Sequence, residues 1–313
     1  MVRIVLTTAL AALMFAGCSK QQPAEETASA GSAEVAEGKA AQATSTNAFA
    51  FRIGELSAFA LRDGYFEFPN DLKIFGLGRT QQEVDAVLAA EGLPTDKLML
   101  SVQPLLVKAA DRVLLFDTGP AGLFGPTSGH VSKALAEAGI DPQTVTDIFI
   151  SHSHGDHVGG LVNAEGKLAY PNATIHLARP EWEFMSANDQ YKPWLSTLTP
   201  KVDAFAPGAQ LVPGVVRAVE IKGHTPGHSG YRITSGPDSL LYVGDTLHHS
   251  VISVQRPDWS MGFDADQALG AQSRAAFIAD MEASGQRIYA VHFPFPGIGK
   301  FAKRGEGYVW IAE

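Results

Sequence analysis

Short apolar runs separated by polar residues occupy most of the chain from Ala48 onward. Runs rich in β-branched and aromatic residues and bounded by Gly, Asp or Asn are typical of strands, whereas apolar residues three and four apart predict helices. We expect strands at residues 48–53, 55–64, 98–109, 112–119, 147–150, 173–178, 215–223, 230–235, 239–246 and 287–293. Helices are expected at residues 130–139 and Asp264–Ser284.

These elements form two similar halves, each with strands and at least one helix. A sheet must bury its apolar face against another layer of structure. The pattern therefore favours an α/β fold in which two sheets pack together and helices cover them.

The N-terminal part has a different pattern. Arg3 precedes an apolar run, Ile4–Ala16, which is shorter than the roughly 20 residues that span a bilayer. Residues 1–17 resemble a bacterial lipoprotein signal peptide, which would make Cys18 the lipidated first residue of the mature protein. Phe15 departs from that pattern, which usually has Leu there, and an ordinary secretory peptide is the alternative.

Residues 18–47 contain few bulky side chains and many Ala, Glu, Gln, Ser and Thr residues. Such a segment cannot bury enough apolar surface to offset the entropy of ordering, so we expect a disordered tether. These features predict a periplasm-facing lipoprotein of the bacterial cell envelope that touches the membrane only through its lipid. Secretion to the periplasm is the alternative.

Composition narrows the class of ligand. The chain has 313 residues, 45% of them apolar, and a formal net charge of −9, so it lacks the basic surplus that nucleic-acid binding requires. A small neutral or weakly charged molecule is the better partner. Cys18 is the only cysteine, so a metal site in the folded region must use histidines and carboxylates.

The segment Ser151–Gly160, SHSHGDHVGG, follows a predicted strand and concentrates such ligands. His152 and His154 point the same way in an extended loop because side chains alternate, so both can bind one cation. Asp156 and His157, on the next turn, can serve a second cation. Burying these polar groups without a partner would be costly, which favours a metal site.

The spacing His-x-His-x-Asp-His resembles the metal motif of the metallo-β-lactamase fold. Further candidates follow in the expected order at the ends of strand runs: His224 in GHTPGHS, Asp245 in YVGDT and His292 in AVHFPFPGIG. The resemblance implies an αβ/βα sandwich of two mixed β-sheets with helices on the outer faces, spanning residues 48–313.

The resemblance also implies two zinc ions. His152, His154 and His224 would hold one ion, Asp156, His157 and His292 would hold the other, and Asp245 would bridge them. Ligands of this kind are also acceptable to cobalt, manganese or iron. A hydroxide shared by two such ions is a nucleophile at neutral pH, so hydrolysis is the expected reaction.

The segments DTGPAGLFGPTSGH, AYPNATIHLARPEWEF, LVPGV and HFPFPGIGKFAKRGEGYVW resemble the methyl parathion hydrolase and lactonase branch of this superfamily. That resemblance runs from about Phe49 to Trp310 and suggests a homodimer. His248, three residues after Asp245, departs from the apolar residue expected there in methyl parathion hydrolases. An imidazole can hydrogen-bond a lactone or ester oxygen but would crowd a phosphotriester.

We therefore expect a hydrolase of lactones or aryl esters, with Asp156 and His248 as candidate catalytic residues. An organophosphate triester hydrolase is the main alternative. A β-lactamase and a non-enzymatic binding lipoprotein are further alternatives. Phe124, Phe184 and Phe263 are candidates for an aromatic substrate wall, although core packing would explain each of them taken alone.

Other polar residues have simpler interpretations. His228 is expected to hydrogen-bond a ligand from behind, and Asp117 either does the same or only forms a turn. His176 is expected to be a core or rim histidine. His130 and His249 are expected to face solvent.

Overall fold

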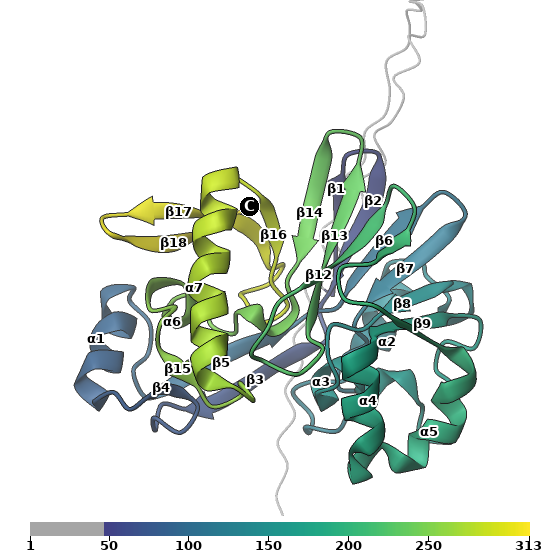
Figure 1. Ribbon diagram of the computed structural model, residues 1–313, viewed down its shortest axis with the longest axis horizontal. Coiled ribbons are helices and arrows are strands. Elements are labelled where there is room, and N and C mark those ends of the chain that lie inside the picture. Colours follow the sequence, from purple (N-terminus) through teal and green to yellow (C-terminus); the bar gives the residue numbers. More distant parts are fainter. Residues whose placement is uncertain (1–46) are drawn as a thin grey trace, which may run out of the picture. The chain divides into compact units, whose positions relative to one another are not determined.

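The computed structural model describes residues 47–313 (Figure 1). The predicted signal peptide, Cys18 and the tether up to residue 46 lie outside the described residues. Asn47, the last residue of the predicted tether, is described, and its side-chain amide donates to the Glu137 carboxylate over 2.6 Å. No helix within residues 47–313 is long and apolar enough to cross a membrane.

The first of two large sheets is built by the N-terminal half. Its strands, in spatial order, are β1 (Ala48–Ile53), β2 (Leu56–Leu61), β6 (Leu105–Ala109), β7 (Arg112–Phe116), β8 (Asp147–Phe149), β9 (Thr174–Ala178) and β10 (Val202–Phe205). β1, β2, β6 and β7 pair antiparallel, whereas β7 to β10 pair parallel, so the sheet is mixed.

The C-terminal half builds the second mixed sheet. Its strands, in spatial order, are β11 (Gln210–Val212), β12 (Val216–Glu220), β13 (Ser229–Ser235), β14 (Asp238–Tyr242), β16 (Arg287–Tyr289), β17 (Ile298–Arg304) and β18 (Gly307–Ala312). β12 and β14 are both antiparallel to β13, and β16 is parallel to β14. β12, β14 and β16 therefore all end at the same edge of this sheet.

The two sheets share an apolar core. Leu105 and Phe116 of the first sheet and Tyr231 and Leu240 of the second belong to one buried cluster. Burial of apolar area at roughly 25 cal/mol per Å² makes this interface a main source of stability.

Helices cover the outer face of each sheet (Figure 1). α2 (Val131–Glu137), α4 (Arg179–Ala187) and α5 (Lys192–Leu198) contribute to the cluster on the first sheet. α7 (Gln267–Ser284) contributes Phe277 and Ile278 to the cluster on the second. The expected αβ/βα sandwich of two mixed sheets is confirmed.

A smaller layer adjoins the sandwich. It contains α1 (Gln81–Ala90), α6 (Ile252–Gln255) and two short antiparallel pairs, β3 (Gly64–Pro69) with β5 (Lys97–Val102) and β4 (Phe75–Leu77) with β15 (Ser260–Met261). An apolar cluster that includes Phe75, Leu88, Leu100 and Trp259 holds this layer together.

The strand predicted at residues 98–109 was wrong as a single element. It divides at Gln103 and Pro104 into β5 and β6, which lie in different sheets. Proline has no backbone N–H for a ladder, and the Gln103 side chain turns to donate to the carbonyl oxygens of Ala290 and Phe293. The helix predicted at residues 264–284 is α7, which begins later, at Gln267. Asp266 caps this helix, because its side chain accepts a hydrogen bond from the Leu269 N–H.

Candidate metal centre and pocket

The predicted ligands lie on four loops, each of which follows a strand. Because β12, β14 and β16 end at one edge, the loops after them come together with the loop after β8. This last loop leads into α3 (Gly155–Val158). Two groups of side chains result: His152, His154, His224 and Asp245 in one, and Asp156, His157 and His292 in the other.

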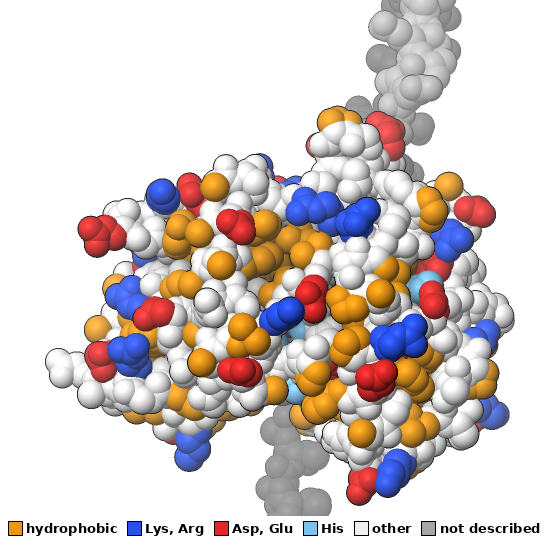
Figure 2. Space-filling view, in the orientation of Figure 1, with side chains coloured by type: hydrophobic (Ala, Val, Ile, Leu, Met, Phe, Trp, Pro, Cys, Tyr) orange, Lys and Arg blue, Asp and Glu red, His pale blue; other side chains and the backbone are white. Residues whose placement is uncertain are grey.

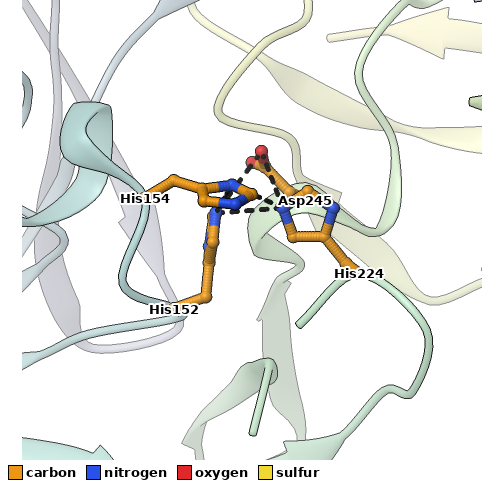
Figure 3. Close-up of side chains that lie close together, drawn as sticks. All are labelled: His152, His154, His224 and Asp245. Atoms are coloured by element: carbon orange, nitrogen blue, oxygen red, sulfur yellow. Dashed lines mark hydrogen bonds and ion pairs between the residues drawn. The ribbon is translucent and has the colours of Figure 1, made fainter. Parts of the chain in front are cut away.

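Three imidazole nitrogens of the first group point at one place (Figure 3). His152 Nε2 lies 3.0 Å from His154 Nδ1 and 3.0 Å from His224 Nε2, and the last two atoms are 3.1 Å apart. Figure 3 shows the Asp245 carboxylate approaching the same place from the side of His224.

Asp245 faces both groups with different oxygens. Its Oδ2 lies 3.4 Å from His224 Nε2 and 3.6 Å from His152 Nε2. Its Oδ1 lies 3.0 Å from His292 Nε2 and 3.2 Å from His157 Nε2. A carboxylate placed in this way can bind one cation with each oxygen.

Hydrogen bonds on the far side of the rings leave lone pairs directed into the site. His292 Nδ1 lies 2.8 Å from the Ser101 carbonyl oxygen, which only accepts, so Nδ1 carries a proton and Nε2 is the nitrogen that can bind a metal. His224 Nδ1 is 3.0 Å from Asp264 Oδ1, with the same consequence. Imidazole nitrogens oriented in this way, with the far nitrogen hydrogen-bonded and the near one facing a shared site, are typical of metal-binding histidines.

The remaining electrostatics also fit a cation. The buried atoms His157 Nε2 and Asp245 Oδ1 have no hydrogen-bond partner. Burial lowers the pKa of His224 to about 4, so the ring is neutral and able to bind metal at pH 7. Burial opposes ionisation of Asp156, but His157 and His292 outweigh it and lower the Asp156 pKa to about 2. The residues present therefore fit a pair of divalent metal ions.

Asp117 lies beneath this centre. Its Oδ1 accepts from the Ser151 N–H over 2.7 Å, and its Oδ2 accepts from Ser151 Oγ, Tyr242 Oη and His157 Nδ1 over 2.6–2.7 Å. Its backbone is left-handed, with φ of 58°, which is unusual outside glycine. The structure therefore places the Asp117 carboxylate in contact with Ser151 and His157, where it can orient the centre from beneath.

His228 lies beneath Asp245. Its Nδ1 is 3.1 Å from the Ile221 carbonyl oxygen, so its Nε2 is free to accept from the Asp245 N–H over 2.9 Å. Gly244, with φ of 50°, permits this approach, because a Cβ there would lie 2.7 Å from His228 Nε2. The structure thus places His228 where it can orient Asp245.

Two further buried residues that contact the ligand loops were not predicted from the sequence. Glu181 is fully buried and bonds to two of the ligand loops, and Asp264 links His224 to the buried Arg274. Asp264 fell at the start of a predicted helix and Glu181 in a segment with no predicted element. Only the three-dimensional fold brings them to the centre.

A pocket of about 740 Å³ opens onto the metal centre. Asp156, Asp245, His154 and His292 form its floor. Its other lining residues are mostly apolar or uncharged: Phe66, Glu67, Phe68, Leu100, Phe124, Thr127, Ser153, Gly155, Phe184, Asn188, Gln190, Tyr191, His248 and Phe263. All three predicted phenylalanines are among them. Phe66 and Phe68 were missed, although their alternation within GYFEFP puts both on one face of a strand.

His248 lines the pocket beside the centre. Its Nε2 is 3.1 Å from Asp245 Oδ2, yet neither ring nitrogen has a hydrogen-bond partner. The ring packs against Phe263, with centroids 5.3 Å apart, and parallel to His292 at 5.8 Å. Packing therefore fixes the orientation of this imidazole, which lines the pocket.

The other histidines are not part of the centre. His130 is exposed, as expected, and His176 bonds to Asp147 and Asp203 at the rim of the first sheet, also as expected. The prediction for His249 was wrong. It is buried, and its Nδ1 accepts from the N–H groups of Val251 and Ile252, over 3.2 Å each, at the start of α6.

The two hydrogen bonds that His249 accepts at the start of α6 predict that the stability of the fold depends on pH. Burial lowers the pKa of His249 to about 4, against 6.5 when unfolded, so its contribution is complete above pH 6.5 and falls as the pH drops toward 4. The loss can reach about 3 kcal/mol. His249→Asn keeps an acceptor at this position without titrating and should reduce this dependence, to which His224 and His228 also contribute, in urea unfolding of the metal-free chain at pH 7 and pH 5. An unchanged slope would contradict the assignment, and exposed His130→Asn is the control.

Charged side chains of both signs are interspersed over the face in Figure 2. That face therefore offers no continuous basic patch for binding phosphates.

Comparison with known proteins agrees with this geometry. The family model described as the metallo-beta-lactamase superfamily matches residues 100–283. An N-acyl homoserine lactonase from Bacillus sp is 26% identical over 202 residues, which cover 58% of this chain and 77% of that protein.

Two solved structures match most of the chain. AidC, a dizinc quorum-quenching lactonase in complex with a product, has 29% identity and a TM-score of 0.79, covering 85% of this chain and 97% of its own. The hydrolase AbOPH of the beta lactamase superfamily has 26% identity and a TM-score of 0.77 over the same shares.

Proposed function

Because this chain belongs to the metallo-beta-lactamase superfamily, we propose that it is a dinuclear zinc hydrolase of uncharged lactones or aryl esters. The observation that carries the proposal is the position of Asp245, whose two oxygens face two separate groups of ligands. The similarity to a dizinc lactonase and to an N-acyl homoserine lactonase supports the reaction class.

The chain's residues would hold the metals in two unequal sites. His152, His154 and His224 offer only nitrogens to one ion, whereas Asp156 gives the other ion a carboxylate in addition to His157 and His292. Two zinc ions would lower the pKa of a shared water toward 7 and polarise the oxygen of a bound carbonyl.

The pocket favours an uncharged substrate. No Lys or Arg lines it within the part of the chain that the structure describes, and its charged lining residues, apart from histidines, are Glu67, Asp156 and Asp245. An anionic group that lies away from the two metals would lose its hydration without gaining a basic side chain as a partner. β-Lactam antibiotics carry a carboxylate, so this observation argues against them. Phosphotriesters are uncharged and remain the second candidate.

His248 separates the two candidates. Its unpartnered ring nitrogens beside Asp245 can donate a hydrogen bond to a lactone or ester oxygen as that oxygen gains charge. His248→Leu should lower kcat on lactones about a hundredfold, in line with loss of one such donor. The same change should raise phosphotriester turnover, because it enlarges the apolar wall.

The matched control is His249→Asn, which changes a buried neighbour that does not line the pocket. It should leave both activities within about twofold at pH 7.5. Equal lactone turnover in wild type and His248→Leu would mean that the imidazole does not act on the substrate.

The experiment that tests the function is a hydrolase screen of the purified chain. Lactones, aryl esters, phosphotriesters and β-lactams would be compared with and without a chelator. We expect chelator-sensitive hydrolysis of lactones or aryl esters to be fastest. Rapid hydrolysis of phosphotriesters without any lactone turnover would reverse the order of the two candidates.

We also propose that Cys18 anchors the chain to the cell envelope, facing the periplasm. The support is the apolar run before Cys18 and the small residues that precede it. Cys18→Ala should move the protein from the membrane fraction to the soluble periplasmic fraction. Membrane retention of this variant would contradict a lipid anchor.

A further inference from the structure

Glu181, in the first turn of α4, is a buried carboxylate to which the proposed hydrolysis assigns no role. It accepts four hydrogen bonds. Oε1 accepts from Ser153 N–H over 2.7 Å and from Ser153 Oγ over 2.6 Å. Oε2 accepts from Thr225 Oγ1 over 2.7 Å and from Gly227 N–H over 2.9 Å. Both lone pairs of each oxygen are therefore used.

The partners of Glu181 adjoin all the histidines of the first group. Ser153 lies between His152 and His154, and Thr225 directly follows His224. One carboxylate thus joins the loop after β8 to the loop after β12. The packing is close as well, because a Cβ at Gly227 would lie 2.3 Å from the Glu181 backbone nitrogen.

The second group does not depend on these bonds. His157 is held by Asp117, and His292 by the Ser101 carbonyl oxygen. The two ligand loops do share a backbone bond, Ser229 N–H to the Ser151 carbonyl oxygen over 2.9 Å, but it lies outside the ligand positions.

We propose that Glu181 is a positioning residue that fixes the spacing of the three histidines and so sets the metal affinity of that site alone. This inference rests on the dinuclear centre of the proposed function. All four partners of Glu181 are donors in these contacts, so the amide of glutamine would turn an N–H group toward a backbone N–H or a hydroxyl. Glutamine therefore keeps the shape of the side chain but replaces one of its two acceptor oxygens with a donor.

The test is a titration of the metal-free full chain with Co²⁺, followed by visible absorption and by calorimetry. Glu181→Gln should weaken one of the two Co²⁺ sites about 10- to 100-fold and change the absorption of that ion. The other site should keep its wild-type affinity and spectrum. Glu183→Gln, on the exposed face of the same helix, is the matched control and should alter neither site.

Unchanged affinity at both sites in Glu181→Gln would overturn the proposal, and so would equal weakening of both, which indicates a general structural role. If Glu181→Gln does not fold, Thr225→Val removes one donor and leaves the carboxylate and its other bonds. It should weaken the same single site about fivefold, and wild-type affinity in this variant would overturn the proposal. Wild type that binds fewer than two Co²⁺ ions would instead contradict the dinuclear centre.

Discussion

Asp245→Asn should lower hydrolysis about a thousandfold, because the Asp245 carboxylate faces both groups of ligands. Asparagine keeps the shape and one oxygen but puts an NH₂ group where the second oxygen was. That group cannot bind a metal and would face either His224 or His292, whose lone pairs are directed into the centre. Metal catalysis is worth several kcal/mol, which corresponds to about three powers of ten in rate.

Two measurements check this prediction. Steady-state kinetics give the loss of kcat, and elemental analysis should show metal content falling from about two ions per chain to about one. Asp238→Asn is the matched control, since it changes an exposed aspartate at the start of the same strand, β14, and should leave both values unchanged. Full activity in Asp245→Asn would mean that the two ligand groups do not act as one centre.

The ligand set could be predicted from the sequence because each ligand follows an apolar run that forms a buried strand. The strand ends mark where polar side chains meet at a sheet edge, and the alternation of His152 and His154 sets their common direction. The fold and the division of these candidate ligands into two groups came from the resemblance of the His-x-His-x-Asp-His spacing to the metallo-β-lactamase motif. The ligands of both groups were thus accessible without coordinates.

The supporting residues were not accessible in this way. Glu181 lies in a helix that begins with Arg179 and Pro180 directly after a strand and was not predicted, and a charged side chain is an unusual residue for a buried face. The role of Glu181 depends on contacts with Ser153 and Gly227, which are 28 and 46 residues away in sequence. Long-range hydrogen bonds of this kind leave no periodic pattern.

Burial of single polar side chains was equally difficult to predict. His249 follows another histidine in a loop, a pattern typical of solvent-facing residues, yet it caps α6 from inside. In the same way, Pro104 divides a continuous apolar run between two sheets. For His249 tertiary contacts outweigh the local pattern, whereas at Pro104 the missing N–H was a local signal that the apolar run obscured.

Asp117→Asn should destabilise the metal-free chain by about 3 kcal/mol, because Asp117 accepts bonds from Ser151, Tyr242 and His157 inside the core. Asparagine tolerates the left-handed backbone at this position, so the change tests the carboxylate and not the turn. Its NH₂ group would face a donor whichever way the amide is oriented. His157 would also lose the carboxylate that fixes its ring.

Urea unfolding of the metal-free chain measures the loss of stability, and kinetics at a temperature where the variant stays folded should show about a 10- to 100-fold loss of activity. Tyr242→Phe is the matched control, because it removes one donor from Asp117 and leaves the three other bonds. It should cost about 1 kcal/mol and change activity only a few-fold. If Asp117→Asn were no worse than Tyr242→Phe in both measurements, Asp117 would be a turn residue whose carboxylate does not support the centre.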